Sequence, residues 1–142
     1  MGPIAEPGRV ARVLVAEDDA DGREMLATAL RNIGAEVEAV EDGGRLLVAI
    51  ASYYRPGNVL RAPDLIVMDV LMPVCSGLSV FEALRAAHWT TPVIVITGKD
   101  TPVVRMSAAI HGATFMLKPI DLVAFQRTAQ RLMVASTLVN HT

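Results

Sequence analysis

Apolar and polar positions along the chain alternate between two patterns. Short runs rich in aliphatic and β-branched residues occur at 12–16, 35–40, 65–69, 92–97 and 114–117. Each run is followed by a turn signal and then by apolar residues at the three- and four-residue spacing of an amphipathic helix. The pattern therefore predicts five strand–helix units in series.

The expected helices lie at about 20–33, after Asp42, from near Gly77, at about 101–110 and at roughly 120–138. Gly34 and Gly112 are expected to end the first and fourth of them. Three strands, 12–16, 65–69 and 92–97, are almost wholly apolar, which is typical of parallel strands covered by helices on both faces. These features predict an α/β domain with a doubly wound parallel sheet.

One folded domain over residues 10–139 accounts for the 142-residue chain, with short tails at 1–9 and 140–142. Residues 52–63 are read as a surface loop carrying Arg55 and Arg61. In 131–139 the apolar residues go nearly round the last helix, which is more than one buried face needs. A partner is therefore expected to cover part of that helix.

Polar side chains follow four of the predicted strands. Glu17 and Asp18 come after the first strand, Asp69 ends the third, Thr97 ends the fourth and Lys118 follows the fifth. Because ligands of open α/β sheets bind outside the carboxyl ends of the strands, these residues are expected to meet in one crevice.

The residue types in this crevice indicate its chemistry. In a flavodoxin-like strand order, 2-1-3-4-5, Asp18 and Asp69 would lie about one strand spacing apart, ~4.8 Å. With Glu17 they offer three carboxylates, a set that suits Mg²⁺ or Mn²⁺ and relieves its own repulsion by binding a cation. Asp69 could then attack phosphorus, while Lys118 and the Thr97 hydroxyl hold the transferred oxygens.

Taken singly, these residues also have ordinary structural roles. Asp19 or Asp21 can be a helix N-cap, Thr97 a strand-end hydroxyl and Lys118 a surface charge. Their joint placement at matching strand ends favours the phosphoryl-transfer site.

Four segments carry a resemblance to a known family. They are "VLVAEDDADGREML", "PDLIVMDVLMPVCSG", "TPVIVITGKD" and "GATFMLKPID", in this order between residues 10 and 138. With them the chain resembles a response-regulator receiver domain, the phospho-accepting part of two-component signalling. The resemblance implies the flavodoxin-like five-stranded sheet, with strand order 2-1-3-4-5 and helices on both faces.

The resemblance also implies roles for the metal and phosphate residues. Asp69 would be the phosphoacceptor, Asp18 a direct metal ligand, Glu17 a ligand through water, and the backbone carbonyl of Leu71 a further ligand. The peptide bond between Lys118 and Pro119 would be cis, which would place the lysine.

By the same resemblance, Thr97 and Phe115 would form a switch. Phosphorylation would draw in Thr97 and let Phe115 turn inward. This would shift the conformational equilibrium of the surface formed by the fourth helix, the fifth strand and the last helix. Gly98 replaces the usual alanine after Thr97. Leu71 and Lys99 occupy positions that influence phosphoryl hydrolysis in the family, and our hypothesis is that apolar Leu71 lengthens the phosphorylated lifetime.

Net charge and composition bear on partners and location. A formal net charge of −2 gives no general attraction to nucleic acid or anionic lipid, and no apolar run approaches a membrane span. Cys75 is the single cysteine, so an internal disulfide is excluded. We expect a cytoplasmic, stand-alone regulator without direct contact to nucleic acid or membrane.

The implied partners are a sensor histidine kinase or a histidine phosphotransfer protein, and a second copy or an effector protein on the switch surface. The chain would be a phospho-acceptor that assists its own phosphorylation and dephosphorylation, not an enzyme. Two alternatives stay open. A pseudo-receiver would work without phosphorylation, and an aspartyl-phosphate hydrolase would need an Asp-x-Asp pair, which "DVL" lacks.

Overall fold

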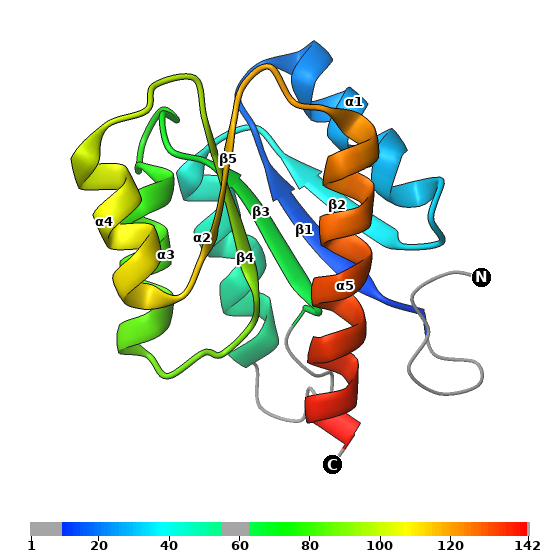
Figure 1. The fold of residues 1–142 in the computed structure, drawn as a ribbon. Coiled ribbons are helices and arrows are strands. Elements are labelled where there is room, and N and C mark those ends of the chain that lie inside the picture. The colour runs from blue at the N-terminus through cyan, green and yellow to red at the C-terminus, as the bar shows by residue number, and fades with distance from the viewer. Residues whose placement is uncertain (1–9, 55–62, 142) are drawn as a thin grey trace.

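The structure, a computed structural model, describes residues 10–54 and 63–141. Five parallel strands form one sheet in the order β2-β1-β3-β4-β5 (Figure 1). Their bounds are β1 (Arg12–Ala16), β2 (Glu36–Val40), β3 (Leu65–Asp69), β4 (Val93–Thr97) and β5 (Thr114–Leu117). The predicted strand order and the parallel arrangement are confirmed.

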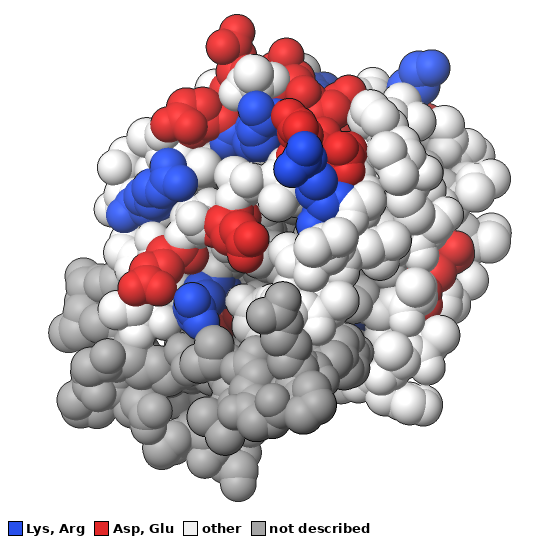
Figure 2. All heavy atoms as spheres, turned by 180° about the vertical axis from the view of Figure 1, so that it is seen from behind, with Lys and Arg blue, Asp and Glu red and all other residues white. Residues whose placement is uncertain are grey.

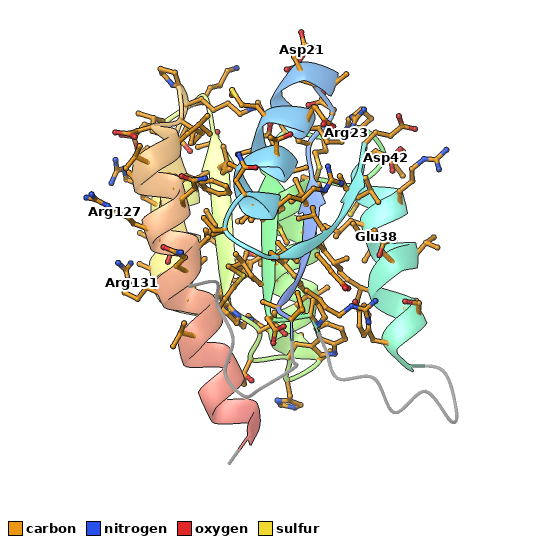
Figure 3. All side chains as sticks on the ribbon, turned by 90° about the vertical axis from the view of Figure 1, so that its right-hand side faces the viewer. Asp21, Arg23, Glu38, Asp42, Arg127 and Arg131 are labelled. Atoms are coloured by element: carbon orange, nitrogen blue, oxygen red, sulfur yellow. The ribbon has the colours of Figure 1, made fainter. Side chains whose placement is uncertain are left out.

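Helices cover both faces of this sheet. They are α1 (Ala20–Arg31), α2 (Gly43–Ala51), the short 3-10 helix η1 (Ser52–Tyr54), α3 (Gly77–Ala86), α4 (Pro102–His111) and α5 (Leu122–His141). On the face seen from behind, the acidic and basic side chains of the described residues are interspersed (Figure 2). Helices α1 and α5 lie next to one another on one side of the sheet (Figure 3).

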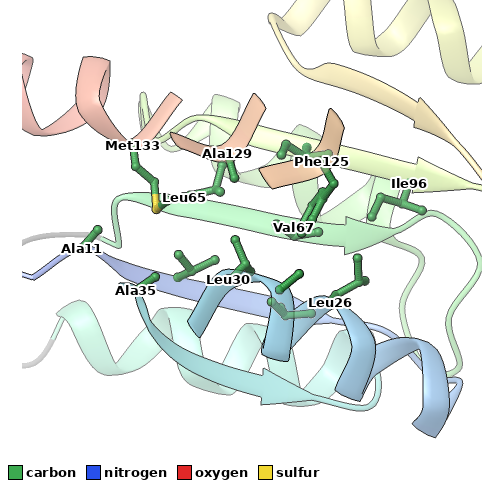
Figure 4. Packing of buried hydrophobic residues seen from close by; sticks show 14 residues of the cluster. Ala11, Leu26, Leu30, Ala35, Leu65, Val67, Ile96, Phe125, Ala129 and Met133 are labelled. Carbon is green, nitrogen blue, oxygen red and sulfur yellow. The ribbon is translucent and has the colours of Figure 1, made fainter. Parts of the chain in front are cut away.

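The central strands supply the core because both of their faces are buried. Strands β3 and β4 are buried at every position and β1 at all but its first. Side chains such as Leu65 and Val67 pack with Phe125 of α5 on one face (Figure 4). Ile66 and Met68 point the other way and pack under α2, α3 and α4. This alternation explains the unbroken apolar runs in the sequence.

The helix ends follow local rules. Gly34 and Gly112 adopt positive φ angles of 93° and 75° after α1 and α4, as the sequence indicates. His88 has a φ of 65° after α3. The sequence did not predict this left-handed conformation, because the residue is not a glycine. Helix α5 begins at Leu122, two residues later than expected, because Asp121 accepts hydrogen bonds from the backbone of residues 123 and 124.

The expectations for the loop 52–63, the N-terminal tail and the end of the last helix have different outcomes. The predicted loop 52–63 begins instead with the helix η1, while 55–62, with Arg55 and Arg61, lies outside the described residues. The N-terminal tail 1–9 does so as well. Helix α5 runs to His141 rather than 138, but the side chains of 135–141, which include much of its apolar end, are not among those described.

Candidate functional site

The carboxyl ends of β1 and β3 bring three acids together with one lysine. Glu17, Asp18 and Asp69 each offer a carboxylate oxygen, and these atoms lie within 4.8 Å of one another. The Nζ atom of Lys118 lies 2.6 Å from Asp69 Oδ2 and 2.6 Å from Glu17 Oε1. Residues that are far apart in the sequence therefore meet at the sheet edge that the strand pattern predicted.

Backbone contacts on both sides fix the position of Asp69. In the β3–β4 ladder it pairs with Ile96, whose carbonyl accepts a hydrogen bond of 3.0 Å from the Val70 N–H. The Leu71 N–H donates to Asp69 Oδ1 at 3.0 Å. Gly77, the first residue of α3, approaches so closely that a Cβ there would lie 2.0 Å from the Asp69 carbonyl oxygen.

Gly77→Ala should therefore disturb the site from the other end of the loop. The added methyl cannot fit beside the Asp69 carbonyl, so we expect the free energy of unfolding to fall by about 1–3 kcal/mol. Gly98→Ala is the matched control, because apart from the glycine and its two chain neighbours no heavy atom lies within 4 Å of a Cβ at that position. Urea unfolding of both variants measures the difference, and equal effects would contradict the steric explanation.

Burial controls the charges in the site. Glu17 is 2% exposed and Asp69 5%. Burial, together with the neighbouring Asp69, raises the pKa of Glu17 to about 7. Burial lowers the pKa of Lys118, but its hydrogen bonds to Asp69 and Glu17 outweigh burial and leave that pKa raised. Lys118 is therefore a fixed cation, and two acids, Glu17 and Asp69, share it.

Glu17→Gln should stabilise the metal-free protein at neutral pH. An acid with a raised folded-state pKa contributes most to stability below its ordinary pKa, and this contribution is lost as the pH rises through the folded-state value. The gain of the variant over wild type should thus grow between about pH 4.5 and 7 and reach about 1–3 kcal/mol above that range.

Urea unfolding with a chelator present, on either side of that pH range, checks this expectation. Glu38→Gln, on an exposed residue of β2, is the control and should show no comparable trend. A pH-independent difference for Glu17→Gln would contradict the assigned cause. Added Mg²⁺ should reduce or reverse the advantage of the variant, because an ion that binds the folded wild type stabilises it.

Thr97 is at the predicted strand end but does not join the acidic cluster. It is 1% exposed, and its hydroxyl donates to the Lys99 carbonyl at 3.2 Å and accepts from the Lys99 N–H at 3.0 Å. The hydroxyl is thus engaged with the loop between β4 and α4. The backbone of Thr97 does meet the site, because its carbonyl accepts from the Lys118 N–H at 2.8 Å.

Other expected positions are found as follows. The Lys118–Pro119 peptide bond is cis. Asp19 is the N-cap of α1 and accepts from the Gly22 N–H at 2.7 Å. Phe115 is partly buried against the core cluster under α2, α3 and α4. The side chain of Leu71 is 55% exposed.

Sequence reasoning missed two arginines near these residues. Arg23 of α1 donates through Nη1 to the Glu17 carbonyl at 3.0 Å and so supports the loop that carries the acids. The guanidinium of Arg105, on α4, lies 4.6 Å from the ring centroid of Phe115. Neither residue stands at a strand end or in a recognisable spacing, so no signal in the sequence identified it.

The donor set of the cluster fits a hard divalent cation. Three carboxylates lie together, and one lysine pairs with two of them, which leaves the group with an excess of negative charge and with oxygen ligands only. Mg²⁺ and Mn²⁺ prefer such ligands. Asp18 is exposed, so the cluster is accessible from solvent.

Within the described ranges, no helix is long and apolar enough to cross a bilayer.

Comparison with known proteins identifies the class. Residues 13–130 match the family model of the response regulator receiver domain, and the chain belongs to this family. It is a receiver domain of two-component signalling, the kind of domain that acts with histidine kinases.

Particular relatives support the assignment. The chain is 34% identical over 138 residues to the alkaline phosphatase synthesis transcriptional regulatory protein SphR of Synechococcus elongatus, a match that covers 91% of this chain and 51% of SphR. It is 36% identical over 112 residues to the response regulator MprA of Mycolicibacterium vanbaalenii, covering 78% and 45%. The chemotaxis response regulator CheY4 of Vibrio cholerae has a similar structure, with a TM-score of 0.70, 30% identity and coverage of 87% and 99%.

The chain spans about half the length of the curated relatives described above. SphR is named as a transcriptional regulator. The expectation of no direct nucleic acid contact therefore stays a prediction.

Proposed function

We propose that this domain accepts a phosphoryl group on Asp69 from a phosphohistidine of a sensor histidine kinase or histidine phosphotransfer protein, with Mg²⁺ or Mn²⁺ bound. The observation that carries the proposal is the meeting of Asp69 with Lys118 and two further acids at the edge of the sheet. A nucleophile, a fixed cation and a metal-binding donor set are the parts that phosphoryl transfer needs.

Each residue has a defined part in this reaction. A carboxylate oxygen of Asp69 forms the new bond to phosphorus as the phosphorus–nitrogen bond of the donor histidine breaks, and the imidazole keeps the electron pair of that bond. Lys118 holds a transferred oxygen and balances its charge. Glu17, Asp18, Asp69 and the Leu71 carbonyl would hold the metal ion, which when bound offsets the repulsion between carboxylate and phosphoryl group.

The phosphorylated state would then be communicated through Thr97 and Phe115. The Thr97 hydroxyl would exchange its bonds to Lys99 for a bond to the phosphoryl group, and Phe115 would turn into the space this leaves. Such a change shifts the equilibrium between two conformations of the surface formed by α4, β5 and α5. A second copy of the chain or an effector protein would bind that surface. We place this activity in the cytoplasm.

The proposal makes the domain a phospho-acceptor and not an enzyme with a separate substrate. A small-molecule phosphodonor with Mg²⁺, followed by intact mass measurement, tests it. Stable addition of one phosphoryl group supports the receiver function. Turnover of a separate phosphorylated substrate would indicate a hydrolase, and no addition under any condition would indicate a pseudo-receiver.

The phosphoryl group should be long-lived on this chain. The Leu71 N–H already binds the Asp69 carboxylate at 3.0 Å, and its half-exposed apolar side chain offers no hydrogen bond to an attacking water. We expect a half-life of minutes or longer, and Leu71→Asn should shorten it. Val103→Asn, on an exposed residue of α4, is the control. A wild-type half-life of seconds, followed by intact mass, would contradict this role of Leu71.

A further inference from the structure

Phe115 of β5 is held from outside by a charged side chain of α4. The Arg105 guanidinium lies 4.6 Å from the centroid of the Phe115 ring, within the range at which a cation is attracted to an aromatic face. The ring also packs against the core cluster beneath α2, α3 and α4. It therefore has two sets of contacts, one to the core and one to a surface cation.

Asp100 orients this cation. Its carboxylate binds the Arg105 guanidinium at two points, Nε to Oδ1 and Nη2 to Oδ2, the second at 2.9 Å. Two-point pairing fixes the plane of the guanidinium. The hydrogen bonds from Arg105 also lower the pKa of Asp100, so the pair stays charged at neutral pH. Exposed pairs contribute little to the stability of a fold, so the main consequence here is the position of Arg105.

The same loop connects this pair to the site. Thr97 ends β4, its hydroxyl binds the backbone of Lys99, and Asp100 is the next residue. Thr97 is thus linked to Phe115 through the Lys99–Asp100 backbone, the Asp100–Arg105 pair and the contact of Arg105 with the ring. In this structure the Thr97 hydroxyl is on its loop while Phe115 lies under Arg105, which is the arrangement proposed for the domain before phosphorylation.

We propose that Arg105, oriented by Asp100, is a positioning residue that holds Phe115 in the partly exposed position it has here and so opposes the switch. This inference rests on the proposed function of Asp69. Movement of Thr97 toward a phosphoryl group would shift the loop that carries Asp100, release Arg105 from the ring and free Phe115. Loss of one such cation–ring contact at an exposed site should change the switching equilibrium about two- to fivefold.

Fluorine NMR can test this directly. The chain has three phenylalanines, so a fluorinated phenylalanine gives three signals, and Phe115→Leu identifies the one from Phe115. Beryllium is titrated in the presence of excess fluoride and Mg²⁺ to form a phosphoryl mimic. The midpoint of the Phe115 signal change is then compared between wild type, Arg105→Ala and Asp100→Asn.

Arg105→Ala should switch at a mimic concentration about two- to fivefold below that of wild type. Asp100→Asn should move the midpoint in the same direction, and the double variant should equal Arg105→Ala, because Asp100 acts through Arg105. Arg105→Lys keeps a cation and should restore part of the wild-type behaviour. Arg45→Ala is the control, since Arg45 is an exposed residue of α2, outside the surface formed by α4, β5 and α5, and should leave the midpoint unchanged.

The outcomes separate the two proposals. If wild type responds to the mimic but Arg105→Ala and Arg45→Ala both keep the wild-type midpoint, the role of Arg105 is wrong and the phospho-acceptor function stands. If no signal of the wild type responds to the mimic, the proposed function fails, and the role of Arg105 fails with it.

Discussion

Asp69→Asn should abolish phosphoryl addition. In the phosphodonor assay with Mg²⁺, wild type should gain the mass of one phosphoryl group, and the variant should gain none. The amide lacks the anionic oxygen that attacks phosphorus, and it also removes one of three carboxylates from the metal-binding cluster. Both losses act on the transfer of the phosphoryl group to residue 69, so we expect no detectable product rather than a slower reaction.

Asp21→Asn is the matched control for this variant. Asp21 is an exposed acid in the first turn of α1, close in sequence to Glu17 and Asp18 but outside the cluster. We expect it to accept phosphoryl like wild type. Phosphoryl addition to Asp69→Asn at the wild-type level would show that another residue is the acceptor, and peptide mapping would then locate it.

Lys118→Ala should lower the rate of phosphorylation by about 10²–10³-fold, the usual loss when one preorganised charge or donor is removed from a reaction site. The amine lies 2.6 Å from Asp69 Oδ2 and from Glu17 Oε1, so it is already in place before any phosphoryl group arrives. Its raised pKa keeps it protonated at neutral pH. The rate of mass gain with a small-molecule donor measures the loss.

Lys118→Arg separates charge from geometry. Arginine keeps the cation, but its planar fork differs in shape from a compact ammonium group, so only part of the rate should return. Urea unfolding of both variants shows whether they remain folded. A rate for a folded Lys118→Ala within a few-fold of wild type would contradict the assigned role of the lysine.

Much of the fold could be predicted because the sequence pattern is strong and local. Apolar runs without alternation identified β3 and β4 as buried parallel strands, and both are buried at every position. Gly34 and Gly112 marked helix ends because few other residues take positive φ readily. Boundaries were less accurate where a single side chain decides them, as Asp121 does for the start of α5.

The gathering of the candidate site was also predictable. Parallel strands present their carboxyl ends at one edge, so Asp69 and Lys118 had to approach each other once the strand order was known. The chemistry of oxygen ligands then pointed to a divalent cation. These inferences use residue type and order along the chain, together with the strand order that the family resemblance implied.

What the sequence by itself determined is therefore the succession of strands and helices, the family, and the residues that meet at the sheet edge. Only the tertiary structure decided that the Thr97 hydroxyl is bound to Lys99, that burial raises the pKa of Glu17, and that Arg105 covers Phe115. The physical reason is that hydrogen-bond choice, desolvation and ring contacts depend on distances between side chains of different elements, and no periodicity along the chain encodes those distances.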